Sequence, residues 1–150
     1  MTSSSAPNQT IAKFGYPVSL IAEYRHWVVL LRPQQATLGA LVLACKSDAT
    51  AFAQIDEAAF GELKAATGDI ETVLGRAFAF EKINYLMLMM VDPQVHFHVI
   101  PRYNVEKSFA GSTFSDPGWP ALPDLASINE IGEETRTALT SFLRDRWPKR

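Results

Sequence analysis

The segment from residue 83 to residue 100 constrains the fold of this chain more than any other. It begins with a nearly unbroken apolar run, INYLMLMMV (83–91), which has the length of a β-strand. Such runs are typical of central strands that are buried on both faces. Asp92-Pro93 is a tight-turn signal, and residues 94–100 then alternate polar with apolar side chains. The segment therefore predicts a β-hairpin whose two strands are connected by two residues.

The sequence before this hairpin predicts further strands and a long helix. Two short strands are expected between residues 18 and 31, and another at 38–46, because β-branched and other apolar residues predominate there. Gly39 marks either a close approach of a ligand to the backbone or a bulge. A helix is expected from its N-cap Asp56 to about residues 76–79, since apolar residues recur at three- and four-residue steps.

The ends of the chain differ in composition from this middle part. Residues 1–10 are polar and uncharged, so we expect a loose tail there and a single domain at 11–150. Residues 104–126 are rich in Gly and Pro and predict a long irregular loop, which in a small domain is typical of a lid or a poorly ordered segment. The sequence Ser-Ile-Asn-Glu at 127–130 predicts a capping box that opens a last helix over 127–146.

Composition excludes several classes of protein. The chain has 150 residues, 47% of them hydrophobic and 20% charged, which excludes global disorder. Fourteen Lys and Arg against 16 Asp and Glu provide no basic surface for duplex nucleic acid. The lone Cys45 cannot form an internal disulfide, no apolar run reaches the roughly 18 residues that span a bilayer, and the start lacks the order of a signal peptide. We therefore expect a cytoplasmic domain without nucleic-acid or membrane partners.

Two histidines lie two residues apart in the second strand of the predicted hairpin. The two-residue period of a strand places His96 and His98 on one face, together with Gln94. Pro101 ends the strand and Arg102 follows, so a guanidinium is expected near the two imidazoles. This row of donors suits phosphate oxygens. A solvated strand face that merely contains histidines, and an Arg102 paired with a surface carboxylate, would also account for the pattern.

Two chemistries are open to such a pair of histidines. Near neutral pH one imidazole can act as a nucleophile while the other donates a proton, which suits phosphoryl-type transfer. Alternatively, two His at i and i+2 can bind zinc or iron, but a metal needs further ligands. Asp92 and Asp116 are available, whereas His26 lies far away in sequence. We favour phosphate chemistry and expect no metal.

The segment QVHFHVIPR (94–102) resembles the signature of the histidine triad (HIT) superfamily, His-φ-His-φ-His-φ-φ, which is often followed by Pro-Arg. The upstream order is also similar: a strand ending in LLRP, a strand led by Gly (LGALVL), a helix and the signature hairpin. The resemblance covers roughly residues 18–103. It implies an α+β fold with an antiparallel sheet of about five strands and two main helices. It also implies a homodimer in which two sheets join, and chemistry that needs no metal cofactor.

The resemblance implies a role for each histidine. His96 matches the histidine that attacks the α-phosphate of a nucleotide and becomes a nucleotidyl-histidine, and His98 matches the one that hydrogen-bonds the phosphate and helps the leaving group depart. The expected function is therefore a nucleotide hydrolase or nucleotidyl transferase. Its substrate would be a nucleoside polyphosphate, such as a diadenosine polyphosphate, or a phosphoramidate.

The chain departs from the family pattern at three positions. Gln94 replaces the first histidine of the triad, Ala40 follows Gly39 where a histidine is usual, and Arg32 stands where Asn or Asp often binds the ribose. We expect Gln94, Arg32 and Arg102 to bind substrate, with Trp119 of the long loop either covering the site or packing the loop onto the domain. Because of Gln94 and Ala40, a nucleotide-binding module with little or no catalysis is the alternative function.

Overall fold

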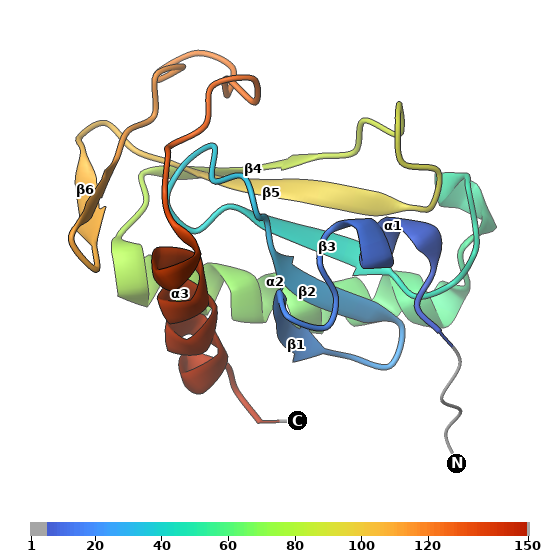
Figure 1. Cartoon of the computed structure of the whole chain (residues 1–150). Helices are drawn as coiled ribbons and strands as arrows, with labels where there is room; N and C mark the ends of the chain where they lie inside the picture. Colours follow the sequence, from blue (N-terminus) through green and yellow to red (C-terminus); the bar gives the residue numbers. More distant parts are fainter. Residues whose placement is uncertain (1–5, 150) are drawn as a thin grey trace.

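A five-stranded antiparallel sheet organises the α+β fold (Figure 1). The computed structural model describes residues 6–149. The strands of this sheet follow the order β1-β2-β3-β5-β4, and their bounds are β1 Leu20–Glu23, β2 Trp27–Leu31, β3 Leu41–Cys45, β4 Lys82–Leu86 and β5 His96–Arg102. The helices are α1 Gln9–Lys13, α2 Glu57–Phe78 and α3 Glu133–Arg146, with a 3-10 turn at Phe52–Gln54. The predictions of an α+β fold, five antiparallel strands and two long helices are confirmed.

The two faces of the sheet are covered by different helices. Alternate residues of β2 and β3, such as Val29 and Leu43, belong to one apolar cluster with Ile70 of α2. The residues between them face the opposite way, and Val28 forms a second cluster with Ile11 of α1. In Figure 1, α1 lies in front of β3 while α2 runs behind the sheet. This alternation is the two-residue period of a strand.

The turn into β3 requires a glycine. Gly39 has a φ of +85°, and a Cβ atom at this position would lie 3.0 Å from the ring of Phe78 in α2. The Gln35 side chain holds the turn, because its Oε1 accepts from the Gly39 N–H at 2.8 Å and its Nε2 donates to the carbonyls of Arg32 and Ala40. The close approach at Gly39 is therefore to α2, and β3 begins at Leu41 in regular register with β2, without a bulge.

The predicted two-residue hairpin is wrong. β4 ends at Leu86, which pairs with His98, so residues 87–95 form the connection. Within the described part of the chain, β4 pairs only with β5 and is an edge strand, whereas a central strand was predicted. Met89 has a φ of +53°, a left-handed conformation that interrupts an extended strand. Beyond it, Met90 and Val91 are 86% and 81% exposed.

The last helix begins later than predicted. α3 starts at Glu133, with Gly132 as its N-cap, and the capping box at residues 127–130 does not form. The Ser127 hydroxyl instead donates to Asp124 at 2.8 Å, and the Ser127 N–H donates to the same carboxylate. This local turn satisfies the polar groups that would have capped a helix.

The structure also differs from the expected loop and tail. Within the loop at 104–126, β6 Lys107–Phe109 and β7 Ser112–Phe114 form a small hairpin. Asn8 and Thr10, which were expected in the tail, are buried at the start of α1. The Asn8 side chain accepts from the Ile11 N–H and donates to carbonyls at the end of β3, which explains its burial. Residues 1–5 of the predicted tail lie outside the described residues.

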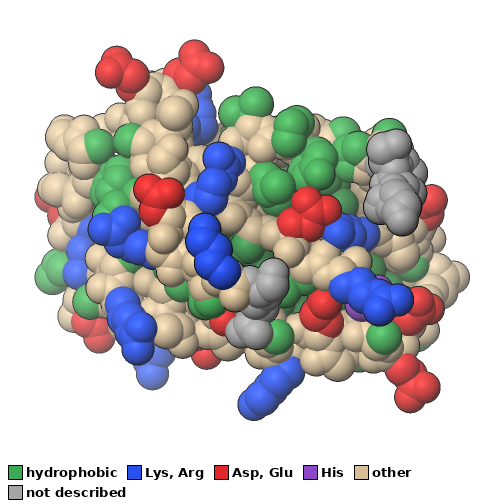
Figure 2. All heavy atoms as spheres, turned by 90° about the horizontal axis from the view of Figure 1, so that it is seen from below, with side chains coloured by type: hydrophobic (Ala, Val, Ile, Leu, Met, Phe, Trp, Pro, Cys, Tyr) green, Lys and Arg blue, Asp and Glu red, His purple; other side chains and the backbone are tan. Residues whose placement is uncertain are grey.

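Charged side chains of both signs are interspersed on the surface. Figure 2 shows both Lys or Arg and Asp or Glu side chains scattered over the face that it draws. None of the helices within residues 6–149 is both long and apolar enough to cross a membrane.

Candidate active site

His96 and His98 lie side by side on β5, between β3 and β4. Their ring centroids are 5.1 Å apart, and the rings meet edge to face. His96 is 2% exposed and His98 is 8% exposed, so both imidazoles are buried. The alternate residues Val95 and Val99 anchor the strand in the core on the other face. The sheet therefore fixes both histidines in a nearly dry environment.

A backbone carbonyl sets the protonation of His96. Its Nδ1 lies 2.8 Å from the carbonyl oxygen of Gln94. A carbonyl can only accept a hydrogen bond, so Nδ1 carries the proton and donates. In the neutral ring this leaves an unprotonated lone pair on Nε2, which is the arrangement a nucleophile needs.

A guanidinium sets the opposite tautomer at His98. The Nε of Arg32 lies 3.3 Å from Nδ1 of His98. Because a guanidinium only donates, Nδ1 accepts and the ring proton is on Nε2. Burial, together with the positive charge of Arg32, lowers the pKa of His98 to about 4. His98 is therefore neutral at pH 7 and presents an N–H donor at its Nε2.

A cavity of about 470 Å³ opens beside His98. The residues that line it come from the end of α1, the end of β2, the connection before β5 and β5 itself: Lys13, Phe14, Arg32, Pro33, Gln34, Val91, Asp92 and His98. The Phe14 ring lies 5.9 Å from the His96 ring and 5.8 Å from the His98 ring, so it covers both. Sequence analysis missed Lys13 and Phe14, because no motif or periodicity singles them out.

Gln94 contributes to the site chiefly through its backbone. Its side-chain oxygen accepts from the hydroxyl and the N–H of Thr10, at 2.7 and 3.1 Å. These bonds attach the start of α1 to the residues immediately before β5. The Gln94 carbonyl meanwhile orients His96. Through its side-chain oxygen, Gln94 thus connects the start of α1 to the residues that precede β5.

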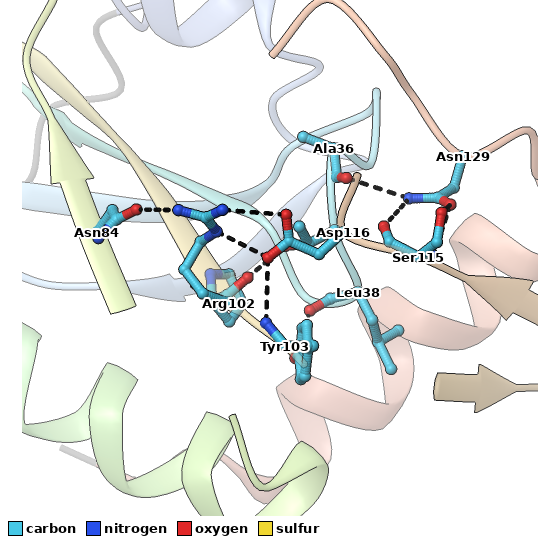
Figure 3. A network of polar contacts seen from close by, with 10 residues as sticks. Ala36, Leu38, Asn84, Arg102, Tyr103, Ser115, Asp116 and Asn129 are labelled. Carbon is cyan, nitrogen blue, oxygen red and sulfur yellow. Dashed lines mark hydrogen bonds and ion pairs between the residues drawn. The ribbon is translucent and has the colours of Figure 1, made fainter. Parts of the chain in front are cut away.

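The side chain of Arg102 contacts Asp116 and Asn84 (Figure 3), and neither histidine is among its hydrogen-bond partners in the described residues. Its guanidinium forms a buried two-point ion pair with Asp116, at 2.8 and 3.1 Å, and donates to Asn84 at 2.8 Å. Asp116 also accepts from the Tyr103 N–H. These contacts attach the loop after β7 to the sheet, and the carboxylate that pairs with Arg102 is a buried one instead of the surface carboxylate considered above.

Trp119 also lies away from the histidine cavity. It lines a separate cavity along β4, together with Arg102 and Leu122. Of the two alternatives weighed for Trp119, the structure thus favours packing of the loop against the edge of the sheet. In the described part of the chain, no three His, Cys, Asp or Glu side chains are grouped as a metal site.

Solved structures with the same fold come from several organisms. A histidine triad protein from Bradyrhizobium japonicum is 18% identical, with a TM-score of 0.71, over 95% of this chain and 97% of that one. A histidine triad protein from Sinorhizobium meliloti 1021 is 19% identical, with a TM-score of 0.71, over 95% and 96%. A diadenosine triphosphate hydrolase from Plasmodium falciparum is 12% identical, with a TM-score of 0.59, over 88% and 80%. At these identities the likeness shows the fold alone.

Comparison of sequences identifies the family. No curated protein sequence matches the chain. The sequence model of the HIT domain, however, matches residues 17–105, which is more than half of the chain and includes both histidines. Together with the shared fold, this match shows that the chain belongs to the HIT (histidine triad) family.

Proposed function

We propose that this protein is a nucleotide hydrolase or nucleotidyl transferase that acts at the α-phosphate through a nucleotidyl-histidine on His96. The observation that carries the proposal is the pair of opposite tautomers on one strand. His96 has an unprotonated Nε2, and His98 has a protonated one, because their Nδ1 atoms contact a carbonyl and a guanidinium respectively. His96 can thus act as the nucleophile, and His98 can donate a hydrogen bond.

The reaction proceeds in two displacement steps. The Nε2 lone pair of His96 forms a bond to the α-phosphorus, while the bond to the leaving group breaks and its electron pair stays with that group. The Nε2–H of His98 hydrogen-bonds the phosphate or the departing atom and stabilises the developing charge. Water, or another acceptor in a transferase, then attacks the phosphorus. The P–N bond breaks, the lone pair returns to His96, and the attacking group loses a proton.

The cavity beside His98 supports a phosphate-bearing substrate. Arg32 and Lys13 supply positive charge to its wall. A nucleoside polyphosphate or phosphoramidate fits this chemistry, since phosphoryl-type transfer depends mainly on positioning and charge stabilisation. The shared fold with a diadenosine triphosphate hydrolase agrees with a diadenosine polyphosphate-like substrate.

A nucleotide-binding module without efficient catalysis is the second candidate. It is favoured by the burial of His96, which is 2% exposed beneath Phe14. It is also favoured by Gln94, which cannot transfer a proton. Calorimetry that shows tight nucleotide binding, together with no product after long incubation, would support this function over the enzyme.

The decisive experiment is to trap the intermediate. Wild-type protein is incubated with an adenosine phosphoramidate, quenched, and searched by mass spectrometry for an adenylyl adduct on His96. His96→Ala is expected to lose the adduct and turnover, while His26→Ala, the matched histidine variant outside the site, keeps both. An adduct elsewhere, or unchanged turnover in His96→Ala, would remove His96 from the role of nucleophile.

We also propose that the protein acts as a homodimer in the cytoplasm. The outer edge of β4 has no partner strand in the sheet of the described chain, and a free edge is a template for pairing with a second copy. Joining of two sheets at β4 would give the larger sheet that the family resemblance implies.

A further inference from the structure

Arg32 is a buried cation without a carboxylate. Its side chain is 8% exposed, and its guanidinium donates to Nδ1 of His98 and, at 2.6 Å, to the carbonyl oxygen of Gln34. Both partners are uncharged. The ion pairs among residues 6–149 join other cations to acids, and none includes Arg32. Arg102, which is 4% exposed, has Asp116 as its counter-ion.

An unpaired guanidinium at this depth is costly. Removing a cation from water carries a large desolvation penalty unless an opposite charge compensates it. An arginine remains charged when it is buried, because its pKa lies far above neutrality. The desolvation penalty therefore remains. The side chain instead lines the cavity beside His98, where a bound anion can reach it. The missing counter-ion is therefore expected from a ligand.

Lys13 adds a second positive charge to the same cavity. Its side chain is 51% exposed, and its ammonium forms an ion pair with Asp92 at 2.6 Å. Asp92 is the one acid among the residues that line the cavity. With Arg32 and Lys13 positive, Asp92 negative and His98 neutral, the lining carries a net positive charge. An anion that binds there gains attraction from Arg32 and can draw Lys13 away from Asp92.

The phosphate that is attacked does not satisfy Arg32. In the proposed reaction that phosphate accepts from Nε2 of His98, whereas Arg32 contacts Nδ1 on the opposite edge of the same ring. The imidazole thus stands between the guanidinium and the reacting phosphorus. We propose that the site binds nucleotides that carry a second phosphate group, held by Arg32 and Lys13, in addition to the phosphate that His96 attacks. This inference rests on the proposed function, and the second phosphate belongs either to the polyphosphate chain or to the ribose.

Calorimetry with ligands that do not react tests the proposal. Wild-type protein is titrated with AMP, with α,β-methylene ADP, and with the 2′,5′- and 3′,5′-bisphosphates of adenosine. At least one ligand with two phosphates is expected to bind about tenfold more tightly than AMP, and the preferred isomer identifies the position of the second phosphate. Arg32→Met is expected to remove the preference, and Lys13→Met to reduce it. Lys46→Met, which replaces a lysine paired with Glu23 outside this cavity, is expected to leave it unchanged.

The outcomes separate this inference from the proposed function. Equal affinities for AMP and all ligands with two phosphates would overturn the inference and leave the enzyme intact. A preference that survives both Arg32→Met and Lys13→Met would also overturn it. A preference without any turnover would support the inference and contradict the catalytic proposal. Absence of binding by every nucleotide would overturn both. Because Lys13 is exposed, its variant keeps the test decisive even if Arg32→Met fails to fold.

Discussion

Two histidines of the same strand acquire opposite properties from the atoms that touch their Nδ1 positions. The contact with a carbonyl leaves Nε2 of His96 unprotonated, so that it can act as a nucleophile. The contact with a guanidinium leaves Nε2 of His98 protonated, so that it can donate a hydrogen bond. The family pattern places a histidine where this chain has Ala40, which is fully buried. The Gln94 carbonyl orients His96 without it. A backbone hydrogen bond can therefore orient His96 in the absence of the histidine that Ala40 replaces.

The neutral state of His98 leads to a prediction about pH. The pKa of His98 is lowered to about 4 by burial and then by the charge of Arg32, whereas a histidine in the unfolded chain titrates near 6.5. Between pH 4 and pH 6.5, His98 therefore binds a proton in the unfolded chain but not in the folded protein. The free energy of unfolding is therefore expected to fall as the pH decreases from about 6.5 to about 4, and to keep the His98 contribution above that window.

Two measurements check this prediction. NMR titration of the imidazole nitrogens is expected to show His98 neutral at pH 5.5, and Arg32→Met is expected to raise its pKa while burial still holds it below 6.5. Urea unfolding at several pH values is expected to show a smaller pH dependence in His98→Gln than in wild type. A His98 titration near 6.5 in the folded wild type would contradict the lowered pKa and with it the predicted pH dependence.

The period of a strand predicted the shared face of the histidines, but not their partners. Gln94, His96, His98 and Arg102 all satisfy the same two-residue rule. What separates Arg102 from the site is Asp116, fourteen residues further on in a segment without periodicity. Arg32 directly follows β2, and His98 lies on β5. These two strands flank β3, so the order of strands in the sheet brings the two side chains together. Pairing across the sheet is long-range information that a local pattern does not contain.

At the scale of elements, the connection after β4 shows why an apolar run can mislead. Met87 and Met89 pack against the core, whereas Leu88, Met90 and Val91 are exposed. Burial therefore varies along a segment whose side chains are all apolar. Composition alone could not reveal that β4 is an edge strand. The helix α2 was predicted well because its apolar stripe is amphipathic over many turns.

The short helix α1 is followed by its C-cap Phe14, whose ring lies against the two imidazoles. This contact leads to a prediction about the access of reagents to His96. Ile11 anchors α1 in the core, while Phe14 at its end is only half-buried and covers both imidazole rings. Replacing Phe14 by Ala removes this cover and leaves the anchor in place. Phe14→Ala is therefore expected to increase the rate at which diethyl pyrocarbonate acylates His96 several-fold.

Peptide mapping by mass spectrometry gives the rate for each histidine, with His26 as the internal reference. Phe60→Ala is the matched control, because Phe60 lies on α2 against Phe52 and away from the histidines. It is expected to leave the His96 rate unchanged. Equal rates in Phe14→Ala and wild type would show that Phe14 does not limit access to His96.

For the whole molecule, the two edges of the sheet differ in how they are protected. At β1, the C-terminal helix α3 packs against the strand, and its Arg144 donates to the Leu20 carbonyl at 3.0 Å. At β4, the segment from Trp119 to Pro123 leaves a cavity along the strand, and Leu122 is 83% exposed beside it. Free edges and exposed apolar side chains are features of interaction surfaces. The asymmetry makes β4 the edge at which a second copy is expected to join.

Sedimentation velocity over a range of concentrations tests this assembly. Wild-type protein is expected to sediment at twice the mass of one chain. Leu122→Glu is expected to shift the equilibrium toward monomer, because it places a charge beside the β4 edge that the second copy would cover. Val18→Glu is the matched control: Val18 is 80% exposed, but it lines a cavity with α3 near the β1 edge. If both variants remain dimeric, or if Val18→Glu alone dissociates, the copies join at a surface other than the β4 edge.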